Sequence, residues 1–176
     1  LNNFGIYFWE THDKMLCKKF GFDELKNEDE EFFTKWQDLM QKLELDYTLF
    51  FNQLEKITPD TILEEHFSPI AYSSLNEEKI RKLKDFIEQY QSRLYSNSIS
   101  KKESLELMKK TNPKFILRNY LLYQCIEEIG NGKTEMLTKL TQDLENPYQQ
   151  LFPGYSVKRP SNYGVTAGCS TLSCSS

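Results

Sequence analysis

The chain has 176 residues, of which 39% are hydrophobic and 14% aromatic, with twelve Phe and ten Tyr. This length can bury a sizeable core, and many aromatic residues with few Gly and Pro exclude a mainly disordered chain. The net charge of −4, with acidic and basic residues interspersed, argues against a general binder of nucleic acids or acidic membranes.

No run of apolar residues is long enough to span a bilayer, so we expect no membrane-spanning segment. Because the chain begins with Leu1, we expect a processed product or a piece of a longer protein. The missing targeting signal therefore says little about the compartment of the parent protein. Four cysteines without metal-ligand spacing fit a reducing, intracellular compartment.

The first predicted helix spans residues 3–20, with Asn3 as a possible N-cap and Gly21 at its end. Its apolar face is predicted to consist of Phe4, Phe8, Thr11 and Met15. His12 and Cys17 lie in the same helix, but their spacing does not place them on one face. A solvated or hydrogen-bonded histidine is therefore favoured over a metal ligand.

Three more stripes of apolar residues at helical spacing follow, and such stripes are typical of core-facing helices. They consist of Phe32, Phe33, Trp36, Leu39, Met40 and Leu43; of Tyr47, Phe50, Phe51, Leu54 and Ile57; and of Ile80, Leu83, Ile87, Tyr90 and Leu94. Asp46 can cap the second of these helices. Ser74 with Glu77 forms a predicted capping box for the third, whose charged residues should face water. Ser100 with Glu103 repeats this signature before a short helix.

The stretch from Asn112 to Gly130 is predicted to be one complete helix, with Asn112 as its N-cap. Its apolar face would consist of Ile116, Tyr120, Tyr123 and Ile126. Arg118 and Asn119 lie inside this apolar run, so we expect them to be buried and to have fixed partners. They could contact a ligand, but we favour a structural anchor that locks the helix to a neighbouring segment.

A last helix is predicted over residues 134–144, with Leu137, Leu140 and Leu144 on one side. After Pro147 the helical period ends and Gly, Pro and Ser become more frequent. We therefore expect a helical region over residues 1–147 and a tail over 148–176, which either lies on a surface or is mobile. No useful β pattern is present. The predicted fold class is all-α, an irregular bundle of about six or seven helices.

No arrangement of residues predicts a catalytic site. Gly132-Lys133-Thr134 matches the end of a phosphate-binding loop, but the signature needs a glycine where Glu127 stands and a preceding strand. The acidic pairs are adjacent in sequence, and adjacent side chains diverge on a helix. We therefore expect no catalytic, cofactor-binding or metal-binding residue in this chain.

The cysteines fall into two classes. Cys17 and Cys125 lie in helical patterns and are interpreted as small buried hydrophobic residues. Cys169 and Cys174 lie in the serine-rich tail, where an accessible thiol could take part in disulfide exchange. Two inert thiols remain the alternative.

Several segments together resemble the C-terminal portion of the SelO (YdiU-like) family. They are NPKFILRNYLLYQCIEE from Asn112, ENPY at 145–148, RPSNYG at 159–164 and the terminal SCSS at 173–176, with MLCKKFGF at 15–22 and DYTLFFNQL at 46–54. The resemblance covers most of the chain. The tail departs from the family at Pro160–Tyr163, where a Pro-Pro-acid-Trp segment is usual, and the stretch around Cys169 is longer.

The resemblance implies the C-terminal helical part of a protein-kinase-like enzyme with protein adenylyltransferase activity. Such an enzyme transfers AMP from ATP, with a divalent metal such as Mg²⁺, to hydroxyl side chains of protein substrates. Its catalytic residues would lie upstream, so this chain alone would be inactive and its partner would be the upstream kinase-like core. The resemblance also implies a bacterial cytoplasmic or mitochondrial location. It maps the family's redox-active cysteine, a selenocysteine in some animal members, onto Cys174, which would form a disulfide to the core.

Two other functions stay open on the sequence. The chain could be a stand-alone helical interaction module with the tail as a recognition peptide. It could also be a small thiol redox protein in which Cys169 pairs with Cys174.

Overall fold

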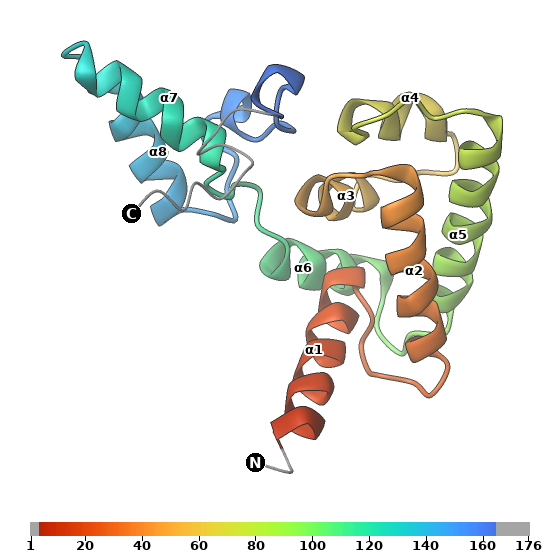
Figure 1. The fold of residues 1–176 in the computed structure, drawn as a ribbon. Helices are drawn as coiled ribbons and strands as arrows, with labels where there is room; N and C mark the ends of the chain where they lie inside the picture. Colours follow the sequence, from red (N-terminus) through yellow and green to blue (C-terminus); the bar gives the residue numbers. More distant parts are fainter. Residues whose placement is uncertain (1–3, 165–176) are drawn as a thin grey trace. The chain divides into compact units, whose positions relative to one another are not determined.

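The computed structural model describes residues 4–164, which form eight α-helices and three short 3-10 helices (Figure 1). In chain order these are α1 (Phe4–Phe20), α2 (Asp29–Leu43), α3 (Tyr47–Leu54), α4 (Leu63–Phe67), η1 (Ser68–Ile70), α5 (Glu77–Tyr95), α6 (Lys101–Thr111), α7 (Asn119–Gly130), α8 (Glu135–Glu145), η2 (Pro153–Tyr155) and η3 (Ser161–Tyr163). No strand occurs within 4–164; a single bridge joins Leu45 to Ala71. The predicted all-α class is confirmed.

The chain divides into two compact units, Leu1–Asn112 and Pro113–Ser176. The first unit contains α1 to α6, and the second contains α7, α8 and the described part of the tail. This division falls within the stretch that the sequence assigns to one helix. The boundary expected at residue 147 concerns composition and stays a prediction.

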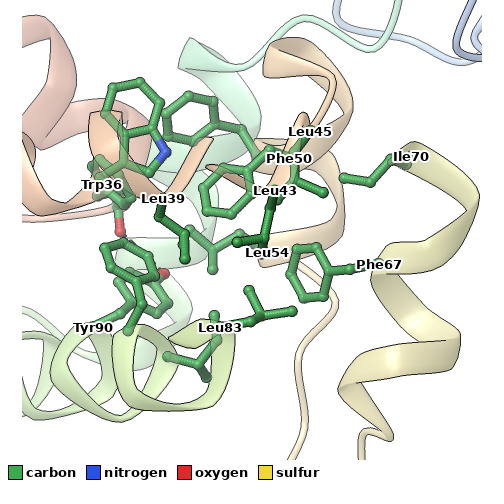
Figure 2. Close-up of a cluster of buried hydrophobic side chains, with 14 of the residues drawn as sticks. Trp36, Leu39, Leu43, Leu45, Phe50, Leu54, Phe67, Ile70, Leu83 and Tyr90 are labelled. Carbon is green, nitrogen blue, oxygen red and sulfur yellow. Dashed lines mark hydrogen bonds between the residues drawn. The ribbon is translucent and has the colours of Figure 1, made fainter. Parts of the chain in front are cut away.

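The core of the first unit forms where α2, α3, α4 and α5 meet. Figure 2 shows Trp36 and Leu39 of α2 close to Phe50 of α3, with Phe67 of α4 and Leu83 of α5 completing the cluster. All five side chains are buried. The apolar stripe predicted for α2 is confirmed, except that Met40 is only partly buried. The stripe predicted for α5 is also confirmed, and its end residues Ile80 and Leu94 are partly buried. In α3 the stripe is confirmed for Phe50, Phe51 and Leu54, whereas Tyr47 is 44% exposed and Ile57 lies beyond the helix and is only partly buried.

Phe20, the last residue of α1, lies at the centre of the aromatic packing in this unit. Its fully buried ring contacts seven other aromatic rings, with centroid separations of 5.0–6.4 Å. The partners come from α2, α3, α5 and the turn after α1. The Tyr90 hydroxyl donates a hydrogen bond to the Phe20 carbonyl at 3.1 Å. The end of α1 is thereby fixed against three other helices.

Gly21 ends α1 as predicted, and its neighbourhood explains why glycine stands there. Its φ of +76° lies in the left-handed region that favours glycine. A Cβ atom at this position would lie only 2.5 Å from the Ser104 hydroxyl oxygen. The Ser104 hydroxyl also donates a hydrogen bond to the Gly21 carbonyl. Helix α6 therefore packs directly on the backbone at the end of α1.

A buried ion pair connects α2 to α5. The Arg93 Nε and Nη2 atoms donate to the two carboxylate oxygens of Asp29, at 2.6 and 2.9 Å. The Glu24 carbonyl accepts from the same guanidinium at 2.8 Å, and the backbone N–H of Lys26 donates to Asp29 at 2.8 Å. The expectation that the charged residues of α5 all face water is therefore wrong for Arg93. Its planar group satisfies a carboxylate and the loop after α1 at once.

Two of the predicted N-caps are confirmed. The side chain of Asp46 accepts from the backbone N–H of Leu49, and the capping box of Ser100 with Glu103 is present. Helix α5, in contrast, is capped by Asn76 rather than Ser74, so that capping box was placed wrongly. Asparagine is an equally good N-cap residue, and the side chain of Asn76 accepts from the backbone N–H of Lys79.

The buried face of α1 differs from the prediction. Phe4, Phe8 and Met15 are exposed, at 72%, 50% and 36%. The buried residues of this helix are Leu16, Cys17, Lys19 and Phe20. Only the C-terminal end of α1 is therefore covered by the first unit; the proposed N-cap Asn3 lies outside the described residues.

Residues 112–130 do not form one helix. Helix α7 begins at Asn119, and the seven residues before it are not helical. Asn112 is instead the C-terminal cap of α6, where its side chain accepts from Lys19 Nζ at 3.1 Å and donates to the Lys19 carbonyl at 2.9 Å. Pro113 does not occupy a first helical position; the residue before a proline favours extended backbone, and Asn112 has ψ of 108°.

We expect the Asp29–Arg93 pair to dominate the polar contribution to stability. Replacing Arg93 by Met should lower the free energy of unfolding by about 3–5 kcal/mol, because the Asp29 charge stays buried without its partner. Urea denaturation checks this, and the double variant with Asp29→Asn should lose less than the sum of the single variants. Lys82→Met, which removes an exposed pair with Glu78, is the control and should leave the midpoint unchanged. A similar small effect of Arg93→Met would contradict the assignment.

Candidate functional site

The residues that the sequence singles out as possible sites are only partly placed. Arg118 and Asn119 are adjacent at the start of α7, where Arg118 is the N-terminal flanking residue and Asn119 the first helical one. Arg118 is half-buried and Asn119 is exposed, so the expectation that both are buried inside a helix is wrong. Cys169 and Cys174 lie outside the described residues. Their pairing and the anchoring role of Arg118 and Asn119 stay predictions.

The second unit has its own small core between α7 and α8. Its buried residues are Phe115, Tyr120, Leu121, Cys125, Met136 and Leu140. The predicted face of α7 is only partly correct, since Tyr120 is buried while Ile116, Tyr123 and Ile126 are 37–60% exposed. In α8 Leu137 and Leu144 are likewise exposed, and Leu140 is buried as predicted. Cys17 and Cys125 are both buried, which confirms their interpretation.

The described part of the tail lies on this core. The Pro147 carbonyl accepts from the backbone N–H groups of Lys114 and Phe115, at 2.7 and 3.1 Å. The Tyr163 hydroxyl accepts from Gln124 Nε2 at 2.9 Å, and its ring lies 5.6 Å from the ring of Tyr120. Of the two behaviours expected for the tail, Tyr155 and Tyr163 show the first, because both pack against this core.

Asp143 of α8 lies near the backbone of Leu151 and Phe152 in the same part of the tail. Its side chain is fully buried, and neither oxygen makes a hydrogen bond of standard geometry. Burial raises the pKa of this carboxyl above its ordinary value of 3.8, while the nearby amides of Phe152 and Leu151 oppose the shift. The effect of burial on the pKa is the larger one, so keeping the carboxyl ionised in the folded state lowers the stability.

Two buried titratable groups in the first unit are also structural. Burial and the neighbouring Asp29 carboxylate raise the pKa of the Cys17 thiol to about 12, which makes it a poor nucleophile. Burial lowers the pKa of Lys19 to about 8, although Glu55 opposes the shift. The Lys19 ammonium lies 4.5 Å from the centre of the Phe51 ring and binds Asn112. It thus joins α1 to the end of α6.

The described part of the chain contains neither a group of side chains that could hold a metal ion nor a phosphate-binding loop at residues 132–134. Among residues 4–164, no three His, Cys, Asp or Glu side chains are grouped closely enough to hold a metal ion. Gly132-Lys133-Thr134 lies between α7 and α8, so a helix precedes it where a phosphate-binding loop needs a strand. His12 binds the neighbouring Asp13 at 2.9 Å, as expected for a satisfied histidine. No described helix is long and apolar enough to cross a membrane.

Sequence reasoning missed the buried polar groups that hold the helices together. Asp29 lies in an acidic run and Arg93 in a charged helix, and both patterns are typical of solvated faces. One signal was available, because Arg93 follows Tyr90 by three positions and Phe86 by seven, on the buried face of α5. Asp143 gives the same signal seven positions after Met136.

The described residues thus define an all-helical region in two units, with buried polar groups that act as structural connections. Comparison with known families identifies it further. The family described as "Protein adenylyltransferase SelO" matches residues 1–147. The chain belongs to the SelO family.

Curated relatives from bacteria agree with this membership. "Protein nucleotidyltransferase YdiU" of Cytophaga hutchinsonii is 31% identical over 180 residues, which covers 100% of this chain and 34% of the relative. The proteins of the same name from Tolumonas auensis and Methylobacillus flagellatus are each 33% identical, over 98% and 92% of this chain and 34% and 32% of their own lengths. The chain spans about a third of the length of the curated relatives it matches.

Asp143 provides a test of the second unit. Because its pKa is raised on folding, the folded state binds more protons than the unfolded state above the ordinary pKa of 3.8, and stability falls as the pH rises through this window. We expect Asp143→Asn to raise the Tm at neutral pH, because the amide is neutral. The advantage should disappear below about pH 4. Scanning calorimetry across this pH range measures it, with the exposed Asp85→Asn as control; a lower Tm for Asp143→Asn at neutral pH would disprove the assignment.

Proposed function

We propose that this chain is the C-terminal helical region of a SelO-type protein adenylyltransferase and that it supports the kinase-like core of the same protein. The parent enzyme would transfer AMP from ATP to hydroxyl side chains of protein substrates. The observation that carries the proposal is the family match over residues 1–147, together with relatives about three times as long that are named protein nucleotidyltransferases.

The support role follows from what the described residues do. Their buried polar groups, such as Asp29 with Arg93 and Lys19 with Asn112, connect helices to one another. The described residues offer no fitting ligand set for the Mg²⁺ ion that such an enzyme would use, so we assign no step of the transfer to them. The reaction would be carried out by the rest of the parent protein.

The proposal has a redox part that concerns Cys174. Its thiol would form a disulfide with a cysteine of the upstream core, with two electrons and two protons passing to a disulfide or peroxide oxidant. The resemblance of the SCSS terminus to the family supports this assignment. A bacterial cytoplasmic location would fit the bacterial relatives.

The activity is tested with the complete open reading frame that contains this chain. We expect the full-length protein to incorporate the AMP group of α-labelled ATP into protein in the presence of Mg²⁺. The 176-residue chain alone should incorporate no label, because it would lack the catalytic core. A stand-alone interaction module predicts no transfer by either polypeptide. Transfer by the 176-residue chain itself would contradict the support role.

Arg118 is tested as the proposed anchor of the second unit. It precedes α7, and its carbonyl accepts from the backbone N–H groups of Leu121 and Leu122 at 2.9 and 3.1 Å. We expect Arg118→Ala to lower the Tm by several degrees, about 1–2 kcal/mol, through the half-buried side chain. Lys133→Ala, at an exposed position of the same unit, is the control and should leave the Tm unchanged. An unchanged Tm with reduced ATP affinity of the full-length protein would make Arg118 a ligand contact instead.

A further inference from the structure

The first two turns of α1 are apolar on every side. Phe4, Ile6, Tyr7, Phe8 and Trp9 follow one another with only Gly5 between them, and the first charged residue of the helix is Glu10. Six consecutive residues cover more than the whole circumference of an α-helix. The segment 4–9 therefore has no polar face that could be turned toward water.

All five large side chains of this segment are exposed, between 50% and 72%. The ring of Trp9 lies 5.2 Å from that of Phe8 and 5.4 Å from that of His12, and all three belong to α1 itself. Burial by the first unit begins only at Leu16, where α1 reaches α6. Figure 1 shows the start of α1 projecting beyond the other helices of this unit.

A helix that is apolar all round is buried in the core of a larger protein or in a membrane. Six residues are far too few to span a bilayer, and no described helix meets the requirement. A second copy of the chain would cover one side of such a helix. The sequence of residues 4–9 instead requires a partner that surrounds the helix on several sides.

We infer that the segment 4–9 of α1 inserts into a groove on the part of the protein that lies outside this chain. Roughly two thirds of the length of the relatives lies outside the match, which is enough for a further core. The family match includes the first residues of the chain, so α1 is part of the family's shared sequence. This inference rests on the proposed function, because it identifies the surface through which the support region would bind the rest of the enzyme.

Trp9 reports directly on this contact. Acrylamide quenching is measured on wild type and Trp9→Phe, in the 176-residue chain and in the complete reading frame; the difference isolates Trp9 from other tryptophans. We expect a Stern–Volmer constant for Trp9 typical of an exposed ring in the short chain and several-fold lower in the full-length protein. The conservative Trp9→Phe exchange keeps an aromatic ring in the groove.

A second pair of variants tests the energetic consequence. Trp9→Ser should leave the Tm of the 176-residue chain unchanged and lower that of the full-length protein. Tyr95→Ser removes another exposed aromatic ring, 90% exposed at the end of α5, and should change neither Tm. This control separates loss of docking from a general effect of removing a surface ring.

Three results would overturn the inference. The first is a Trp9 that is equally accessible to acrylamide in the full-length protein. The second is a Trp9 already protected in the short chain, by its own second unit or by a second copy seen in sedimentation. The third is protection only by vesicles of phosphatidylcholine and phosphatidylglycerol, which would indicate a membrane partner. AMP transfer by the full-length protein with an accessible Trp9 would disprove the docking surface and leave the proposed function standing.

Discussion

The packing of aromatic rings around Phe20 is the constraint on which the first unit depends. Seven rings from α2, α3, α5 and the following turn converge on one side chain at the end of α1. Aromatic pairs gain more than their buried area alone would give, so these contacts hold several helices in one arrangement. The left-handed backbone of Gly21 follows directly, because the chain must turn at once and leave room for α6. Phe20 thereby sets the relative positions of α1, α2, α3 and α5, and Gly21 leaves the space in which α6 packs.

Buried polar groups then fix what apolar packing leaves adjustable. Apolar contacts are non-directional, whereas the two-point contact between Arg93 and Asp29 allows only one register of α5 against α2. The same guanidinium binds the Glu24 carbonyl and lies 4.3 Å from the centre of the Phe22 ring. Arg93 of α5 therefore holds the loop that follows α1 in place. Lys19 and Asn112 have the corresponding role where α6 ends.

The sequence predicted the buried face correctly for helices that pack against other helices of the same unit. The stripe of α2 is almost fully correct, because its apolar side meets α5 and its charged side meets water. The start of α7 could not be found in the same way. Residues 115–117 are as apolar as a helix interior, so their pattern does not show that they precede α7, and Asn112 binds Lys19 instead of capping a helix that contains them. This contact joins residues 93 positions apart, which a local pattern does not contain. The prediction for the candidate site was wrong for the same reason, because the burial expected for Arg118 and Asn119 followed from extending the helix to Asn112.

The errors in the predicted helix faces fall in two directions. Phe4 and Phe8 of α1, Ile126 of α7 and Leu144 of α8 were all expected inside and are exposed in the unit to which each belongs. In the other direction, Arg93 of α5 was expected to face water and is buried, and the buried Asp29 and Asp143 were missed. An apolar period therefore predicts which face of a helix can be buried, but a second element of the fold decides whether that face is covered. Buried polar residues likewise depend on a partner distant in sequence, as Arg93 does on Asp29, 64 positions away.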